Sequence, residues 1–202
     1  MQKLPSQKEL FQRSLTGHLP EKDFDKLQST TVLVAGLGGG SNIAELLVRK
    51  GIGGLIIADN DVYEPHNIRQ RCSQLSNLYK SKVQANLERL KDINPHANIR
   101  AVSEGITSEN CKEIVSESDF IVDMVDLHGV EAKIKLHRET RKQRKYALTA
   151  PSVINGAVLW IFSPNSPTFE EFFGINNNQS IYALAENLIQ AAIPNFPKEA
   201  PR

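Results

Sequence analysis

A run of apolar, β-branched residues leads directly into a glycine-rich loop, and this junction constrains the fold more strongly than any other feature of the sequence. Residues 30–35 (TTVLVA) show no polar alternation, which is typical of a strand buried on both faces. The loop 36–41 (GLGGGS) follows at once, a helix is predicted over 42–50, and a second buried strand over 55–58. This unit predicts parallel strands joined by a helix, with backbone N–H groups in the loop that can approach a phosphate.

Helical and strand patterns alternate along the rest of the chain. Further strands are predicted over 99–102, 120–125, 146–151 and 157–162, and further helices over 78–93, 108–115, 130–144 and 182–192. The alternation predicts a Rossmann-like α/β fold, with a mainly parallel sheet and helices on both faces. We divide the chain into an N-terminal arm (1–29), a nucleotide-binding domain (30–193) and a Pro-rich, mobile end (194–202).

Charge and cysteine content exclude several classes of protein. The 202 residues carry 24 Lys and Arg against 23 Asp and Glu, so the chain is not a generally basic nucleic-acid binder. Cys72 and Cys111 are too few for a disulfide framework or a structural zinc site. No stretch approaches the roughly 18 apolar residues of a membrane span. We therefore expect a soluble, cytoplasmic protein that has no membrane partner.

The residues after the glycine loop indicate which nucleotide binds there. Asp59 lies 23 residues after Gly36, close to the spacing of about 20 at which an acid accepts hydrogen bonds from ribose hydroxyls. A glycine-rich turn without a ligand, or a dinucleotide such as NAD, would fit the loop alone. The aperiodic segment 59–76 and the helix after it add Asn67, Arg69 and Lys82, and cations there suit a triphosphate with a divalent metal.

These motifs together resemble the ThiF/MoeB/HesA superfamily, the bacterial relatives of ubiquitin-activating enzymes. The resemblance runs from about Arg13 to Phe173. It rests on the glycine loop, Gly51-Ile52-Gly53, Asp59-Asn60-Asp61, Asn67 with Arg69-Gln70, Lys80-Ser81-Lys82-Val83, Ile93-Asn94-Pro95 and Asp123 to Asp126. It implies a Mg²⁺-dependent enzyme that uses ATP to adenylate a carboxylate, releasing pyrophosphate. Typical substrates are the C-terminus of a ubiquitin-like sulfur carrier and, in the TcdA-like branch, a threonylcarbamoyl group on tRNA.

The resemblance also implies roles for individual residues. The nucleotide-binding residues would be Gly36, Gly38, Gly39, Asp59, Asp61, Asn67, Arg69 and Lys82. Arg69, or Arg71 in its place, would stabilise phosphate charge together with Lys82 during the reaction, and Asp126 would hold Mg²⁺. The alternatives stay open, because Asp59 and Asp126 could cap helices and Arg69 and Lys82 could be solvated surface cations.

Arg13 stands in the stretch from which family members send an arginine into the neighbouring subunit's site. The resemblance therefore implies a catalytic Arg13 and a homodimer. A plain surface arginine on the arm is the alternative.

Cysteine usage departs from the family pattern. Many members carry a zinc-binding CxxC pair where this chain has Thr168 to Phe172, and thioester-forming members need a cysteine after the metal aspartate. We therefore expect no zinc and no catalytic cysteine, so that the reaction stops at the adenylate. Cys72 is the one exception we keep open, because neighbouring arginines could lower its pKa, whereas Cys111 has the pattern of a packed residue.

The segment 133–145 is rich in Lys and Arg and includes His137. We interpret it as the solvated face of a helix, with contact to tRNA phosphates as the alternative. His66 and His128 are expected to line the site as polar groups rather than to bind metal.

The sequence thus predicts an ATP-dependent adenylyltransferase of the ubiquitin-like modifier activating type. Three alternatives remain: a TcdA-like tRNA dehydratase, a non-catalytic nucleotide-binding scaffold within a larger protein, and an NAD-binding oxidoreductase. Pyrophosphate exchange separates the enzyme from the scaffold, and protection by ATP–Mg²⁺ but not NAD separates it from the oxidoreductase.

Overall fold

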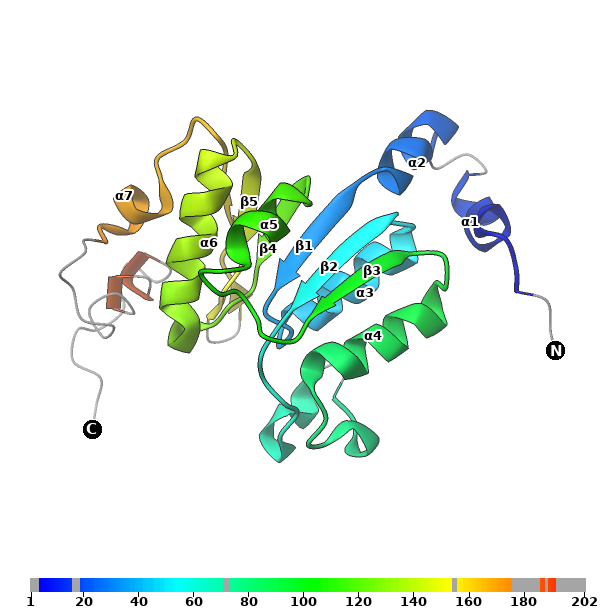
Figure 1. The fold of residues 1–202 in the computed structure, drawn as a ribbon, viewed down its shortest axis with the longest axis horizontal. Helices are drawn as coiled ribbons and strands as arrows, with labels where there is room; N and C mark the ends of the chain where they lie inside the picture. The colour runs from blue at the N-terminus through cyan, green and yellow to red at the C-terminus, as the bar shows by residue number, and fades with distance from the viewer. Residues whose placement is uncertain are drawn as a thin grey trace.

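A computed structural model describes residues 4–15, 19–70, 73–153, 156–175, 186–187 and 189–191 (Figure 1). A six-stranded sheet in the order β3-β2-β1-β4-β5-β8 runs through it. The strands are β1 (Thr31–Ala35), β2 (Gly54–Ala58), β3 (Asn98–Val102), β4 (Phe120–Asp123), β5 (Tyr146–Thr149) and β8 (Trp160–Phe162). All neighbouring pairs are parallel except β5 and β8, so the predicted mainly parallel α/β sheet is confirmed.

Helices cover both faces of the sheet, as predicted (Figure 1). One face packs on α3 (Gly40–Lys50) and α4 (Lys82–Ile93), through side chains such as Val34, Ile57 and Val48. The other face packs on α5 (Cys111–Ser116) and α6 (Val130–Lys142), through side chains such as Leu33, Ile56 and Leu136. Burial of β1 and β2 on both faces explains why their sequences lack polar alternation.

The strand order of the sheet changes direction between β1 and β4. From β1 the chain proceeds to β2 and β3 on one side, and it then returns to place β4 on the other side of β1. Loops leaving the carboxyl ends of two such strands diverge and leave a crevice between them, which is where open α/β sheets bind ligands. The glycine loop after β1 and residues 124–126 after β4 flank this point.

Several predicted boundaries are wrong by a few residues. The strand predicted over 120–125 ends at Asp123, because the Asp123 side chain accepts a hydrogen bond from the Val125 amide and turns the chain. The helix predicted from residue 78 begins at Lys82, after Tyr79 has adopted a positive φ of 66°. The strand predicted over 157–162 is divided between β7 (Gly156–Ala157), which pairs with β6 (Ser152–Val153), and β8.

The described residues of the predicted N-terminal arm form two helices, α1 (Gln7–Leu15) and α2 (Glu21–Gln28). Phe11 and Phe24 anchor them, with ring centroids 5.6 Å apart, and both rings lie against Gly51 at the end of α3. The helix predicted over 182–192 and the Pro-rich end lie largely outside the described residues. Within the described parts of the chain, no helix is long and apolar enough to cross a membrane.

Candidate nucleotide-binding site

The glycine loop turns sharply away from β1 at Gly36, which has a φ of +89°. Its amide donates a hydrogen bond to the Ala58 carbonyl at 2.8 Å. A Cβ atom at this position would lie 2.5 Å from the carbonyl oxygen of Met124, so only glycine fits here. The loop is therefore pressed against the chain segment that follows β4.

Asp59 connects the glycine loop to the segment after β2. Its Oδ2 accepts a hydrogen bond from the Leu37 amide at 2.6 Å, and its Oδ1 accepts one from the Asp61 amide at 2.9 Å. The half-buried Asp59 carboxylate thus fixes the glycine loop. Asp59 also lies at the end of β2, which is where a ribose-binding acid is expected. The two roles are compatible, because each carboxylate oxygen can accept more than one hydrogen bond.

Lys82 lies at the start of α4 and reaches back towards the same segment. Its Nζ is 2.5 Å from Asp61 Oδ2, and its side chain is only 8% exposed, whereas that of Asp61 is 59% exposed. The hydrogen bond from Lys82 lowers the pKa of Asp61 below its usual value, against the opposing effect of burial. Lys82 is therefore a buried cation with a fixed position, and its interpretation as a solvated surface lysine is wrong.

The short 3-10 helix η1 (Pro65–Arg69) carries the predicted Asn67 and Arg69. Asn67 is buried and its Oδ1 accepts a hydrogen bond from the Glu64 amide at 2.9 Å, so it also shapes the turn. Arg69 ends this helix, while Arg71 and Cys72 lie outside the described residues.

Gln70 is a member of this site that the sequence analysis quoted within the Arg69-Gln70 motif but gave no role. A Cβ atom at Gly38 would lie 3.3 Å from the Gln70 Nε2 atom, so the side chain packs on the glycine loop. Its Oε1 is buried and has no hydrogen-bond partner within the described parts of the chain. The only signal in the sequence was its place directly after Arg69.

Asp126 follows β4 and is 79% exposed. Its Oδ1 accepts hydrogen bonds from the amides of His128 and Gly129, at 3.0 and 3.3 Å, and so caps the short helix η3 (Leu127–Gly129). The capping role considered in the sequence analysis is therefore present, and the exposed carboxylate still has room for a further ligand. His66 and His128 are both largely exposed, at the rim of this region.

Among the predicted site residues that the structure describes, Arg13 lies away from the glycine loop. It is an exposed residue of α1, which packs beside Gly51 at the C-terminal end of α3, whereas the glycine loop lies at the opposite end of that helix (Figure 1). An eleven-residue helix separates the two ends by roughly 15 Å. Arg13 therefore does not join the glycine loop of its own chain.

The interpretation of 133–145 as a solvated face is wrong for two of its members. Lys133 and His137 are buried in α6, where Lys133 Nζ lies 2.6 Å and His137 Nε2 lies 2.8 Å from Asp123 Oδ2. Burial raises the pKa of Asp123, but the charges and hydrogen bonds of Lys133 and His137 outweigh it and lower the pKa to about 2. Asp123 is thus an ionised carboxylate in the core, at the end of β4.

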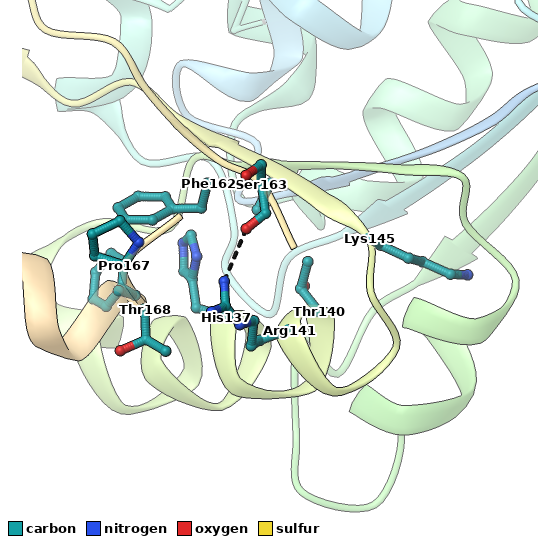
Figure 2. Close-up of a pocket in the computed structure, with 10 residues that line it drawn as sticks. His137, Thr140, Arg141, Lys145, Phe162, Ser163, Pro167 and Thr168 are labelled. Carbon is teal, nitrogen blue, oxygen red and sulfur yellow. Dashed lines mark hydrogen bonds between the residues drawn. The ribbon is translucent and has the colours of Figure 1, made fainter. Parts of the chain in front are cut away.

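A small cavity lies on the far side of His137, between α6, β8 and α7 (Phe169–Phe173) (Figure 2). Its volume of about 10 Å³ admits roughly one water molecule, so it is not a nucleotide site. Arg141 closes it by donating to the carbonyl of Ser163, as Figure 2 shows, and to that of Ser166. The Phe169 ring stacks on His137 with centroids 4.2 Å apart.

Cys111 is buried at the start of α5, and burial raises the pKa of its thiol to about 11. At pH 8, alkylation of Cys111 by iodoacetamide is expected to be at least about 100-fold slower in the folded protein than in urea, because the reactive thiolate is scarce. Peptide mapping by mass spectrometry, which separates the Cys111 peptide from that of Cys72, measures the rate. Equally fast labelling in both states would show that Cys111 is a reactive thiol.

The parallel sheet, the glycine loop after β1 and the acid at the end of β2 define a Rossmann-like α/β protein. The ThiF family model matches residues 11–192, and the chain belongs to the ThiF family. The resemblance inferred from the motifs is thereby confirmed.

Individual relatives agree with this assignment. The chain is 28% identical over 160 residues to the molybdopterin-synthase adenylyltransferase of Haemophilus influenzae, covering 76% of this chain and 65% of the relative. It is 28% identical over 141 residues to the sulfur carrier protein ThiS adenylyltransferase of Escherichia coli, covering 69% and 55%. The E. coli tRNA N6-threonylcarbamoyladenosine dehydratase TcdA in complex with ATP superposes with a TM-score of 0.66 at 25% identity, covering 73% and 62%. The chain thus spans between about half and two thirds of the length of these proteins.

Proposed function

We propose that this protein uses ATP to adenylate a carboxylate, forming an acyl-adenylate and pyrophosphate. The observation that carries the proposal is a continuous chain of contacts at the carboxyl ends of β1 and β2. The Leu37 amide binds Asp59, Asp59 binds the Asp61 amide, and the Asp61 carboxylate binds Lys82. Four residues that the ThiF resemblance assigns to the nucleotide, counting Gly36 beside Leu37, are therefore neighbours. The names of the adenylyltransferase relatives and the ATP complex of TcdA support the same activity.

In this proposal, each residue of the site has a role that follows from its chemistry. The glycine loop and the N-terminus of α3 present amides to the phosphates, and Asp59 receives the ribose hydroxyls. A substrate carboxylate oxygen then attacks the α-phosphorus, the bond from that phosphorus to the bridging oxygen breaks, and pyrophosphate leaves with the electron pair. Lys82, held beside Asp61, and Arg69 stabilise the charge that develops on the phosphate oxygens.

Asp126 is the residue that would hold Mg²⁺. Within the described residues no group of three or more His, Cys, Asp or Glu side chains could hold a metal ion by itself. The single exposed carboxylate of Asp126 suits Mg²⁺, which commonly binds one or two protein carboxylates together with substrate phosphates. When bound, the ion would supply charge neutralisation for the departing pyrophosphate.

Exchange of labelled pyrophosphate into ATP tests the proposal. Candidate carboxylates are a small protein ending in Gly-Gly and a tRNA carrying threonylcarbamoyl-adenosine, the two substrate types that the ThiF resemblance implies. We expect exchange that depends on the carboxylate, on Mg²⁺ and on Lys82. Binding of ATP without exchange for any carboxylate would favour the scaffold alternative, and thermal stabilisation by NAD rather than ATP–Mg²⁺ would favour the oxidoreductase. Adduct formation sensitive to reductant would contradict our expectation that the reaction stops at the adenylate.

We further propose that the active unit is a homodimer in which Arg13 acts on the site of the neighbouring subunit. Support comes from the placement of Arg13 on α1, away from the glycine loop of its own chain. Arg13→Ala and Asp126→Ala subunits, each inactive alone, are expected to regain up to about a quarter of wild-type exchange when mixed, because one site in a heterodimer has both residues. No regain of exchange, or a monomer by light scattering at the assay concentration, would contradict the proposal.

A further inference from the structure

A buried polar cluster under the candidate site has no part in the proposed reaction. Asp123, at the end of β4, has a side chain with 0% exposure, and its partners Lys133 and His137 are 7% and 3% exposed. Lys133 Nζ also donates to Thr149 Oγ1 at 3.2 Å. Asp123 and Thr149, at the carboxyl ends of β4 and β5, are thus joined to two buried side chains of α6.

The two oxygens of Asp123 have different partners. Oδ2 receives Lys133 and His137, whereas Oδ1 accepts a hydrogen bond from the Val125 amide at 3.1 Å. The second contact fixes the turn formed by residues 124–126, which leads directly into Asp126. The contacts of Lys133 and His137 with Oδ2 fix the orientation of the Asp123 carboxylate. Its Oδ1 atom is thereby kept in position to accept the hydrogen bond from the Val125 amide.

The same turn is the support of the glycine loop. The Met124 amide donates to the Ala35 carbonyl at 2.7 Å, and the Met124 carbonyl lies where a side chain on Gly36 would begin. The Met124 side chain lies against Gly39 and Gly40. A displacement of the turn would therefore move both the phosphate-binding loop and Asp126.

Stability alone does not account for such a cluster, because a buried ion pair can often be replaced by apolar residues of similar size without loss. Polar networks that are fully hydrogen-bonded are better suited to selecting one arrangement of the chain. We infer that Asp123, held by Lys133 and His137, is a positioning residue that fixes the turn 124–126 and thereby sets the geometry of the nucleotide site. The inference rests on the proposed function, since it concerns the binding of ATP at that site.

Two double variants separate the Val125 contact from the ion pair. Asp123→Leu/Lys133→Met removes the charges and the acceptor for the Val125 amide, with little change in volume. Asp123→Asn/Lys133→Met also removes both charges, but the Asn side chain can accept from Val125 and donate to His137. As a matched control, Glu45→Leu/Arg89→Met replaces a second buried carboxylate that also has two basic partners. Glu45 of α3 lies 2.8 Å from Arg89 of α4 and 2.7 Å from Arg49 of α3.

Two measurements test the effect of these variants on the nucleotide site and on the turn 124–126, and neither requires catalytic turnover. Isothermal titration gives the affinity for ATP–Mg²⁺, and NMR hydrogen exchange gives the protection of the Val125 amide without nucleotide. We expect the Leu variant to bind ATP at least about 10-fold more weakly and to lose Val125 protection, because a small displacement of positioning groups has effects of this size. The Asn variant and the control should stay within about threefold of wild type in affinity. Circular dichroism and urea unfolding confirm that each variant folds.

Wild-type affinity in the Leu variant would overturn the inference, as would an Asn variant that is as weak as the Leu variant. If the Leu variant does not fold, Asp123→Ala/Lys133→Met removes the same acceptor without bulk beside His137 and takes its place. If the wild-type protein binds no ATP, the proposed function fails. The protection of Val125 in the two variants then still decides whether Asp123 fixes the turn.

Discussion

Asp126→Ser is expected to lower pyrophosphate exchange at least about 100-fold, with the free energy of unfolding within about 1 kcal/mol of wild type. Removal of one group that stabilises transition-state charge typically has an effect of this size on turnover. Serine can still accept the hydrogen bonds that Asp126 receives from the amides of His128 and Gly129, so the cap of η3 is retained. The substitution therefore removes the carboxylate that would bind Mg²⁺ but keeps a side-chain oxygen that can cap η3. Radiolabel exchange and urea unfolding measure the two quantities.

Asp119 provides the matched control at the other end of β4. Its Oδ2 accepts a hydrogen bond from the Thr31 amide at 2.7 Å, a structural contact of the same kind on the opposite edge of the sheet. Asp119→Ser should leave exchange within about threefold of wild type. If Asp126→Ser keeps near wild-type exchange, Asp126 serves only as the cap of η3 and does not hold Mg²⁺. Its hydrogen bonds to the amides of His128 and Gly129 are consistent with that alternative.

The fold could be predicted because β1 and β2 are buried on both faces and, apart from Thr31 at the start of β1, contain only glycine and apolar residues. Residues 30–35 and 55–58 have this pattern, and β1 and β2 lie within or beside these ranges. The end of β4 was missed because the apolar run continues through Val125, although the chain has already turned. A hydrogen bond from a side chain to the backbone two residues on decides that boundary, and hydrophobic periodicity does not detect such contacts.

The candidate site was predictable to the extent that its residues form local motifs. Asp59, Asp61 and Lys82 belong to such motifs, and they are in contact in the structure. The buried cluster was missed because Lys133 and His137 are ordinarily surface residues, so α6 looked like a charged helix throughout. The available signal was spacing: Val130, Lys133, His137 and Thr140 recur at intervals of three and four and are all buried. Only the carboxylate at the end of β4 explains why a lysine and a histidine occupy that stripe.

Gly36→Ala is expected to lower the free energy of unfolding by about 3 kcal/mol and to abolish detectable ATP binding. Part of the loss comes from the φ of +89°, since a left-handed conformation costs a residue with a Cβ atom about 1–2 kcal/mol. The rest comes from overpacking, because the new methyl group would lie 2.5 Å from the Met124 oxygen and 2.8 Å from the Val125 nitrogen. Both contacts are with backbone atoms, which cannot move aside as a flexible side chain could.

Gly174 separates the two contributions. It also has a positive φ, +62°, but the nearest atom to a Cβ atom there is 3.9 Å away, so Gly174→Ala should cost only about 1 kcal/mol. The difference between the two variants, measured by urea unfolding, is then the free-energy cost of the overlap between the new methyl group and the turn after β4. An equal loss of unfolding free energy in Gly36→Ala and Gly174→Ala would mean that the turn after β4 moves easily to make room for the methyl group. A turn that moves so easily could not hold the glycine loop and Asp126 in one geometry. A larger loss at Gly36 would show that the loop and the turn form one rigid unit, as the proposed nucleotide site at this edge of the sheet requires.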